Sequence, residues 1–101
     1  MRTTVMNTDG CSVIRLQGRF DFSSHRDFRE ATEKAITAQD CRTISVDLGD
    51  VDYLDSSALG MLLMLRDKAQ AASKPVSLDR CRGAVRQVLD IANFGKLFAI
   101  S

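Results

Sequence analysis

Residues Val51–Leu65 have the sequence VDYLDSSALGMLLML. An acidic approach leads to two adjacent hydroxyls, Ser56 and Ser57, and an apolar run follows at once. This order predicts a loop from a strand into a helix, with Asp55 or Ser56 at the N-cap of the helix. Both serines are therefore expected at a helix N-terminus, where a hydroxyl can cap the helix, react or become phosphorylated.

The residues after the serines predict a helix from Ala58 to Ala72, because nearly all of them are good helix formers. Four apolar residues are expected to cover the sheet: Leu59, Leu62, Leu63 and Ala69. The apolar set is wider than one stripe, so Met61, Met64 and Leu65 cannot all reach the same core. Two interpretations stay open: the helix is buried on both sides, or part of its apolar surface, including the methionines, binds a partner.

Upstream of this stretch the sequence predicts a hairpin, a helix and a strand. The expected strands are Thr3–Asn7, Cys11–Gln17 and Thr43–Leu48, and the expected helix runs from Ser24 to about Gln39. Asp9-Gly10 is a strong hairpin turn signal, and Ser24 with Asp27 has the pattern of a capping box. The connector Arg19–Phe22 carries two aromatic residues that are expected to tuck under the domain. The third strand is expected to end before Gly49-Asp50.

Downstream, the sequence predicts a strand at Pro75–Asp79, a helix at Cys81–Ala92 and a last short strand at Leu97–Ile100. Pro75 ends the preceding helix because proline cannot continue it. The order is therefore β-β-α-β-α-β-α-β. Strand–helix–strand units place parallel strands side by side, and polar alternation in the strands predicts helices on one face. We expect an α/β fold in a single domain, residues 1–101, with a mixed sheet of about four to five strands and helices packed mainly on one face.

Composition limits the classes of protein to which the chain can belong. With 101 residues, 45% of them hydrophobic and 27% charged, the chain is expected to form one soluble domain. Its formal net charge of +1 gives no reason to expect binding to nucleic acid or to membrane surfaces. No apolar run approaches the roughly 20 residues that span a bilayer. The polar N-terminus lacks a secretion signal, so a cytoplasmic protein is expected.

The histidine and cysteine content argues against a metal site and against catalysis. Cys11, Cys41 and Cys81 are scattered, and His25 is the only histidine, so we expect reduced thiols and neither a zinc site nor a disulfide framework. A nucleophilic serine would need a general base, and His25 is expected in another helix. The sequence also lacks the GxSxG, GxxxxGKS and GxGxxG motifs. We therefore expect no catalytic residues, no metal and no cofactor.

Acidic residues dominate the region around the two serines. No lysine or arginine lies between Arg42 and Arg66, whereas four aspartates do: Asp47, Asp50, Asp52 and Asp55. An acidic patch beside an exposed serine suits a surface that docks a basic partner. Aspartates are also typical of strand ends, helix caps and turns, so charge alone leaves both interpretations open. A phosphate here would add about −1.5 to −2 charges without melting a helix whose N-terminus tolerates anions.

The run VDLGDVDYLDSSALGMLL at Val46–Leu63, with the order of elements around it, closely resembles the STAS domain. The resemblance covers essentially the whole chain and is closest to the bacterial anti-sigma factor antagonists (anti-anti-sigma factors). LQGRFDF at Leu16–Phe22 resembles the family's connector after its second strand, and VRQVLDIANFGKLFAI at Val85–Ile100 resembles its third helix and last strand. Two positions depart from the family pattern: Ala58 stands where many members have glycine, and Arg19 where relatives are often acidic.

This resemblance implies a partner-switching role. In that family the unphosphorylated protein binds a serine kinase of the histidine-kinase-like ATPase type, which is also an anti-sigma factor, and frees what the kinase sequestered. The kinase phosphorylates the serine directly after the motif aspartate, here Ser56, and a PP2C-type phosphatase reverses the modification. Asp21 matches the connector aspartate and Asp55 the motif aspartate. The residues expected to flank this site or contact the partner are Asp21, Asp52, Asp55, Ser57, Ala58, Met61 and Met64.

The leading hypothesis is therefore an anti-sigma factor antagonist, in which phosphorylation of Ser56 weakens binding and the catalysis belongs to the partner enzyme. A second hypothesis is a STAS subunit of a membrane ABC transport complex for lipids. There the same helix would bind an ATPase subunit, and the serine need not be phosphorylated. The intact DSS motif together with Asp21 favours the first hypothesis. Neither hypothesis involves nucleic acid or insertion of this chain into a membrane.

Overall fold

The structure, a computed structural model, describes the whole chain, residues 1–101. Its strands and helices are, in order, β1 (Arg2–Thr8), β2 (Cys11–Phe20), α1 (His25–Thr37), β3 (Thr43–Leu54), α2 (Ser56–Ala71), β4 (Val76–Asp79), α3 (Gly83–Ile91) and β5 (Ala99–Ile100). Two short 3-10 helices, η1 (Phe22–Ser24) and η2 (Phe94–Lys96), precede α1 and β5. The predicted order of strands and helices is confirmed.

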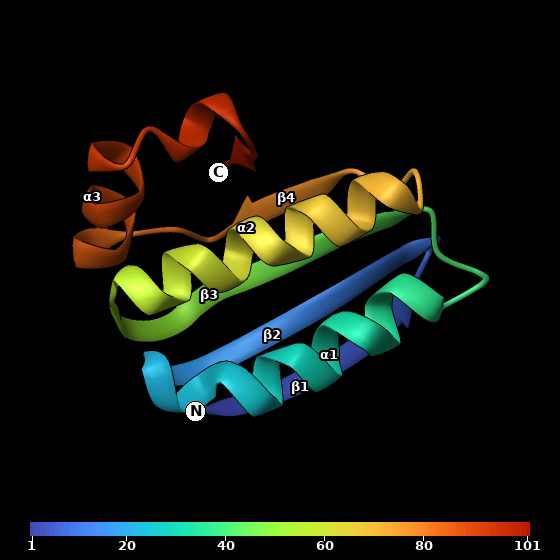
Figure 1. Cartoon of the computed structure of the whole chain (residues 1–101), viewed down its shortest axis with the longest axis horizontal. Helices are drawn as coiled ribbons and strands as arrows, with labels where there is room; N and C mark the ends of the chain where they lie inside the picture. Colours follow the sequence, from blue (N-terminus) through green and yellow to red (C-terminus); the bar gives the residue numbers. More distant parts are fainter.

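All strands form one sheet in the order β1-β2-β3-β4-β5. β1 and β2 are antiparallel, whereas the other neighbouring strands are parallel. Parallel neighbours need crossover connections, which α1, α2 and α3 supply. α1 and α2 lie side by side over one face of the sheet, and α3 lies at the carboxyl end of the parallel strands (Figure 1). The predicted α/β class with a mixed sheet is confirmed.

The hairpin between β1 and β2 turns at Asp9 and Gly10, as predicted. Their φ values are 50° and 79°. Positive φ at both central residues identifies a type I′ turn, whose twist matches that of the flanking strands. The ladder that follows pairs β1 with β2 without a bulge, from Thr8↔Cys11 to Arg2↔Gln17.

The core lies between the sheet and the two helices α1 and α2. Side chains alternate across a strand, and alternate residues of the central strands have no exposed surface, among them Ile14, Leu16, Val46 and Leu48. Leu62 of α2 is equally buried. Full burial of one such side chain contributes about 1.5–3 kcal/mol, so this layer supplies most of the driving force for folding.

β3 is longer than predicted, because Gly49 and Asp50 continue the strand instead of following its end. The strand runs to Leu54, so the predicted strand-to-helix loop shrinks to Asp55 alone. The guanidinium of Arg80 lies over Gly49, and a methyl group at position 49 would be 2.5 Å from Arg80 Cζ. Gly49 therefore allows the close approach of an arginine and does not mark a turn.

β2 is also longer than predicted and ends at Phe20. The two aromatic residues of the connector have opposite environments. Phe20 is fully buried, with its ring centroid 5.0 Å from that of Phe28. Phe22 is 75% exposed. The expectation that both rings tuck under the domain is correct for Phe20 and wrong for Phe22.

The C-terminal elements are shorter than predicted, since α3 begins at Gly83 and β5 at Ala99. The three cysteines are free thiols, as predicted. Burial raises the pKa of Cys81 to about 11. This thiol precedes α3 and is not activated.

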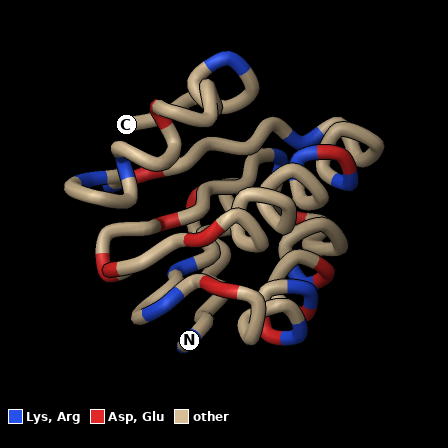
Figure 2. The backbone as a smooth tube through the Cα atoms, turned by 60° about the vertical axis from the view of Figure 1, so that its left-hand side comes forward, with Lys and Arg blue, Asp and Glu red and all other residues tan.

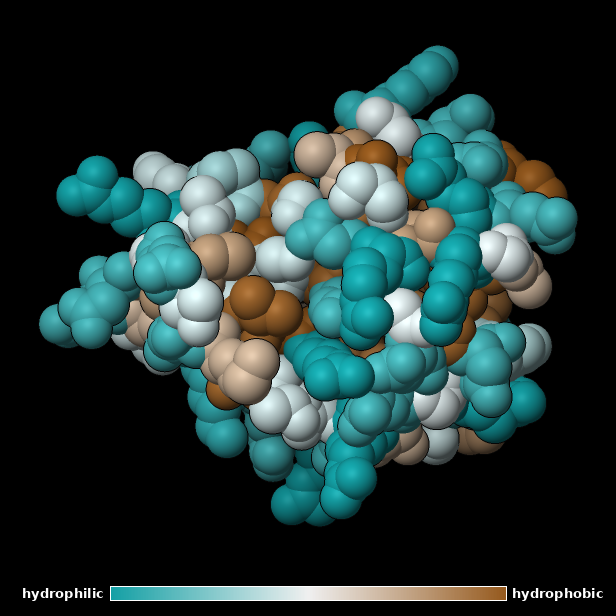
Figure 3. Space-filling model, turned by 180° about the vertical axis from the view of Figure 1, so that it is seen from behind, coloured by the Kyte–Doolittle hydropathy of each residue, from teal (hydrophilic) through white to brown (hydrophobic).

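The face of the sheet turned away from α1 and α2, here called the open face, carries many hydrophilic side chains, with hydrophobic ones showing between them (Figure 3). Arg15 Nη2 donates to Asp50 Oδ2 over 2.7 Å, and Arg80 donates to both oxygens of Asp47 over 2.8 and 3.0 Å. The hydrogen bond from Arg15 lowers the pKa of Asp50. Partial burial raises the pKa of Asp47, but the hydrogen bonds from Arg80 and from the Gly49 N–H outweigh it, so this pKa is lowered too.

The Asp47–Arg80 pair predicts a loss of stability in acid. The folded-state pKa of Asp47 lies below its unfolded value, so the pair stabilises the fold above about pH 4, and this contribution is lost as the pH falls through the folded-state pKa. Asp47→Asn should lower the free energy of unfolding by about 1 kcal/mol or less near neutral pH, because Arg80 is half exposed. Urea denaturation at neutral pH and below about pH 3 measures this. A difference between the two proteins that persists unchanged in acid would contradict the ion-pair account.

Candidate functional site

The carboxyl ends of β2 and β3 bring Asp21 and the serine pair to one edge of the sheet. The two strands are parallel, and Phe20 is aligned with Leu54 where they end. The Asp55 N–H donates to the Phe20 carbonyl across 3.3 Å. This bond ties the start of α2 to the end of β2. Ser56 and Ser57, together with Asp21 and Asp55, are called the Ser56 site below. Asp52 lies in a neighbouring hollow that Arg82 and Gly83 also line, at the start of α3.

Asp55 is the N-cap of α2, which decides between the two predicted alternatives. Its backbone is extended, with φ −106° and ψ −178°, and its side chain accepts a hydrogen bond from the Ala58 N–H over 2.9 Å. Its carbonyl accepts from the Leu59 N–H over 3.2 Å. The helix therefore begins at Ser56, and no serine hydroxyl is needed to cap it.

Both serine hydroxyls are free. Ser56 and Ser57 are exposed, and with Asp55 taking the Ala58 N–H neither Oγ has a hydrogen-bond partner within the chain. Another enzyme can reach such a hydroxyl without unfolding the domain. The N–H groups and dipole of the first helical turn favour negative charge at this point.

Asp21 is held by its own network on η1. Its Oδ1 accepts from the Ser23 hydroxyl over 2.6 Å and from the Ser23 N–H over 3.0 Å, and Arg19 Nε lies 3.6 Å from Oδ2. The hydrogen bond from the Ser23 hydroxyl is the largest cause that lowers the pKa of Asp21, followed by the Ser23 N–H and the Arg19 charge. Asp21 therefore presents a negative charge in a fixed position at the Ser56 site.

The same network corrects the prediction for the start of α1. The Asp21 side chain caps η1, and Ser24 Oγ accepts from the Asp21 N–H over 3.2 Å, which completes a capping box. Ser24 forms no side-chain cap bond to α1. The predicted capping box of Ser24 with Asp27 is therefore wrong, because the true box lies three residues earlier in the sequence.

The acidic charge around the serines is smaller than the sequence predicted. Asp47 and Asp50 pair with arginines on the open face, which leaves Asp52 and Asp55 from the acidic segment. Asp52 is exposed and forms no ion pair. Positive and negative positions are mixed over the surface instead of separating into an acidic and a basic side (Figure 2).

Ala58 and Met61, expected to flank the site or contact a partner, have core side chains. Ala58 has no exposed surface and Met61 is 5% exposed, whereas Met64 is 46% exposed. Helical spacing places Ala58, Met61 and Leu65 on the inner side of α2, and Met64 turns outward. A partner can therefore reach Met64 but not the other two. Two leucines expected in the core are only half-buried: Leu59 and Leu63.

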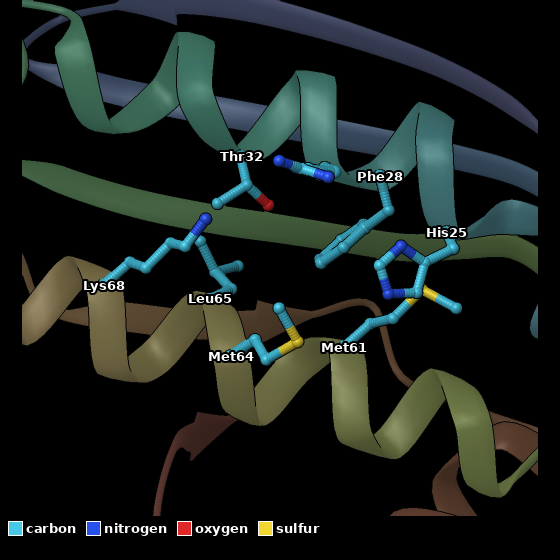
Figure 4. Close-up of a pocket in the computed structure, with 8 residues that line it drawn as sticks. His25, Phe28, Thr32, Met61, Met64, Leu65 and Lys68 are labelled. Carbon is cyan, nitrogen blue, oxygen red and sulfur yellow. The ribbon is translucent and has the colours of Figure 1, made fainter.

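A shallow groove between α1 and α2 carries the exposed methionine (Figure 4). Its apolar lining comes from Met64 together with three buried side chains: Phe28, Met61 and Leu65. Its polar members are His25, Arg29, Thr32 and Lys68. His25 is exposed, as predicted. It directly follows η1, so the groove begins near the Ser56 site.

Sequence reasoning missed two aromatic residues beside the site. Phe22 is the most exposed of the phenylalanines named above. Tyr53 is the second-last residue of β3, with the centre of its ring 4.1 Å from Arg19 Cζ. Stacking of the guanidinium on the ring stabilises this pair. The sequence alone does not bring Arg19 and Tyr53 together, because their contact depends on the register between β2 and β3.

Loss of the α2 cap is expected to destabilise the domain. Asp55→Ala should cost about 1 kcal/mol, because the Ala58 N–H loses its acceptor. For a domain of this size that lowers the melting temperature by roughly 4–8 °C. Asp55→Asn keeps a capping oxygen and should restore most of the loss. An Asp55→Ala protein that melts with the wild type would contradict the assignment of the cap.

Two general properties complete the description of the site. No helix is both long and apolar enough to cross a membrane. No cluster of three or more His, Cys, Asp or Glu side chains is placed to hold a metal ion.

A family model described as "Mlab, STAS domain" matches residues 3–99. The chain belongs to the STAS domain family. A STAS-domain containing protein of Pseudomonas aeruginosa (strain UCBPP-PA14) is 50% identical over 101 residues, which cover 98% of this chain and 97% of that protein. BtrV of Bordetella bronchiseptica, named as an anti-sigma factor antagonist, is 27% identical over 100% of this chain and 86% of its own length.

Solved structures share the STAS fold over nearly the whole chain. The anti-sigma factor antagonist SpoIIAA in its unphosphorylated form gives a TM-score of 0.74 at 24% identity, covering 99% of this chain and 87% of that chain. SpoIIAA of Bacillus in its phosphorylated form gives 0.73 at 23% identity, covering 99% and 91%. At these identities the likeness concerns the fold alone.

Proposed function

We propose that this STAS protein is an anti-sigma factor antagonist that acts by partner switching, with Ser56 as the phosphorylated residue. The observation that carries the proposal is the free, exposed Ser56 hydroxyl at the first position of α2, fixed beside β2 by the Asp55–Phe20 bond. A rigidly placed serine without a general base suits a residue on which another enzyme acts. BtrV, which aligns along the whole chain, is named as an anti-sigma factor antagonist.

In its unphosphorylated form the Ser56 site binds a serine kinase that is also an anti-sigma factor, an ATPase of the histidine-kinase-like type. Three large side chains around the site are exposed in the single chain: Phe22, Tyr53 and Met64. Binding of the kinase would bury them, and buried side chains of this kind anchor protein–protein interfaces. Asp21 and Asp52 add charges that complement basic groups of the kinase. Binding of the kinase releases the factor that the kinase had sequestered.

Phosphorylation of Ser56 reverses this binding without unfolding the domain. The phosphate adds about −1.5 to −2 charges and considerable bulk at the centre of the contact surface. The helix N-terminus stabilises the anion locally, so the fold persists. The neighbouring side chains of Asp21 and Asp55 are themselves negative and do not neutralise the phosphate. The nearby cation, Arg19, already pairs with Asp21 and stacks on Tyr53.

Catalysis of both reactions belongs to the partners. The kinase supplies ATP, metal and any base for phosphoryl transfer, and a PP2C-type phosphatase removes the phosphate. The role of this chain is to present the hydroxyl and the docking surface.

The proposal is tested by incubating the protein with serine kinases of this type from its own cell, ATP and Mg²⁺, followed by mass spectrometry. Wild type and Ser57→Ala should gain one phosphoryl group, and Ser56→Ala none. Phosphorylation of Ser56→Ala to the same extent would assign the site to another residue.

A second candidate function is a STAS subunit of an ABC transport complex for lipids. The observation that favours it is the description of the matching family model, "Mlab, STAS domain". In that case the α2 surface around Met64 would bind an ATPase subunit. Co-purification from the native cell distinguishes the candidates: a transporter ATPase that stays bound to both wild type and Ser56→Asp would favour this second function.

A further inference from the structure

The outer edge of β1 is the one long strand edge in this molecule without a partner. β1 has 7 residues, whereas the strand at the other end of the sheet, β5, has 2. Natural proteins protect such edges with lysine, proline or a bulge. β1 contains none of these, and its only charged side chain is Arg2 at the first position.

The hydrogen-bond pattern of the hairpin shows which groups of β1 face outward. In a hairpin with a two-residue turn, the flanking pair Thr8↔Cys11 exchanges both backbone bonds, and bonded pairs then alternate along the ladder. The backbone groups of Thr8, Met6 and Thr4 are therefore used by β2. Those of Thr3, Val5 and Asn7 point away from the sheet.

We propose that a second copy of the protein occupies this edge, with the two β1 strands antiparallel and Val5 opposite the partner's Val5. In this register Thr3 lies opposite the partner's Asn7, so every outward-facing residue meets another outward-facing residue. The two sheets then form one continuous sheet related by a two-fold axis. This pairing goes beyond the proposed function and does not depend on it.

The side chains fit this register on both faces of the sheet. Val5, which packs against the core, stays on the side of α1 in both copies. On the open face Thr4 lies opposite the partner's Met6, and Met6, 52% exposed in the single chain, becomes covered. Arg2 lies opposite the partner's Thr8, beside the partner's Asp9, so the one cation of the edge meets an acidic residue.

α1 supplies a second, independent match. It contacts both β1 and β2 and lies over β1 (Figure 1), so the two copies of α1 lie next to each other across the two-fold axis. Asp27 and Lys34 lie two turns apart on the side of α1 opposite to Arg29, which lines the groove toward α2. Both are exposed and neither forms an ion pair within the chain. In the antiparallel arrangement Asp27 faces the partner's Lys34.

Sedimentation equilibrium on the full chain tests the proposal. Wild type should reach twice the chain mass of 11.2 kDa as the concentration rises. Thr4→Lys/Met6→Lys places like charges opposite each other at two symmetrical positions and should raise the dimer dissociation constant about tenfold. Thr4→Lys/Met6→Glu places opposite charges there and should restore the dimer. Both positions are exposed in the single chain, and circular dichroism confirms that each variant is folded.

Two results would contradict this pairing of the β1 strands. Wild type that keeps the single-chain mass at every concentration would overturn the proposal, as would a dimer that both double variants leave unchanged. Ser56→Ala should dimerise like wild type, because the Ser56 site lies at the ends of β2 and β3 and outside the β1 edge. The two proposals are therefore tested separately. A wild-type protein that dimerises but accepts no phosphate on Ser56 would contradict only the proposed function, and one that is phosphorylated but stays a single chain would contradict only the dimer.

Discussion

Ser56→Asp is expected to weaken binding to the kinase by about tenfold or more, which corresponds to about 1.4 kcal/mol, while the melting temperature stays close to that of wild type. The side chain at position 56 is exposed at the start of α2, where a carboxylate is compatible with the helix dipole. The cap itself comes from Asp55 and is untouched. The added charge therefore acts on the partner and not on the fold.

Ser56→Ala and Ser57→Asp are the matched controls. Ser56→Ala should bind like unphosphorylated wild type and change stability by no more than about 0.5 kcal/mol. Ser57→Asp adds the same charge one position later in the same turn. Its affinity for the kinase, compared with that of Ser56→Asp, shows how strongly binding depends on the position of the charge. Titration calorimetry gives the affinities and thermal denaturation the stability. If Ser56→Asp changes neither quantity, the charge-switch account is wrong.

Met61→Asp is expected to unfold the domain or to destabilise it by at least about 3 kcal/mol, a large share of the roughly 5–15 kcal/mol that holds a domain of this kind together. Met61 is 5% exposed and packs in the core, so an aspartate there would be buried without a partner. The change is read by urea denaturation, or by the loss of a cooperative transition.

Met64→Asp is the matched variant, because it places the same substitution three residues later on the outward side of α2. Met64 is 46% exposed, so stability should change by no more than about 0.5 kcal/mol. Binding to the kinase should fall if the α2 surface contributes to the interface. Equal destabilisation by the two substitutions would contradict the orientation of α2.

Features set by neighbouring residues were predictable from the sequence. The Asp9-Gly10 turn and the amphipathic spacing of α1 depend on local conformation and periodicity. The choice of Asp55 over Ser56 as N-cap remained open, because both residue types cap helices and only the backbone conformation distinguishes them.

Features set by distant residues were not predictable. Gly49 resembles a turn residue until Arg80 is seen to lie over it, and the pairing of Asp47 with that same arginine joins β3 to the end of β4. The acidic patch was therefore overestimated. Likewise, the pattern of α2 showed that the methionines could not all be buried, but not that Met61 packs inward while Met64 turns to solvent.

Ser56 and Ser57 have similar environments, since both side chains are exposed and free of hydrogen bonds at the start of α2. The choice of Ser56 comes from the resemblance of the DSS motif to that of the anti-sigma factor antagonists. Mapping the phosphate to one of the two serines therefore tests this choice directly.

That measurement is the intact mass and peptide map of the protein isolated from its own cell, before and after treatment with a PP2C-type phosphatase. The account predicts two species that differ by one phosphoryl group, with the phosphate on Ser56 and removed by the phosphatase. A phosphate on another residue, or a single unmodified species under every growth condition, would contradict it.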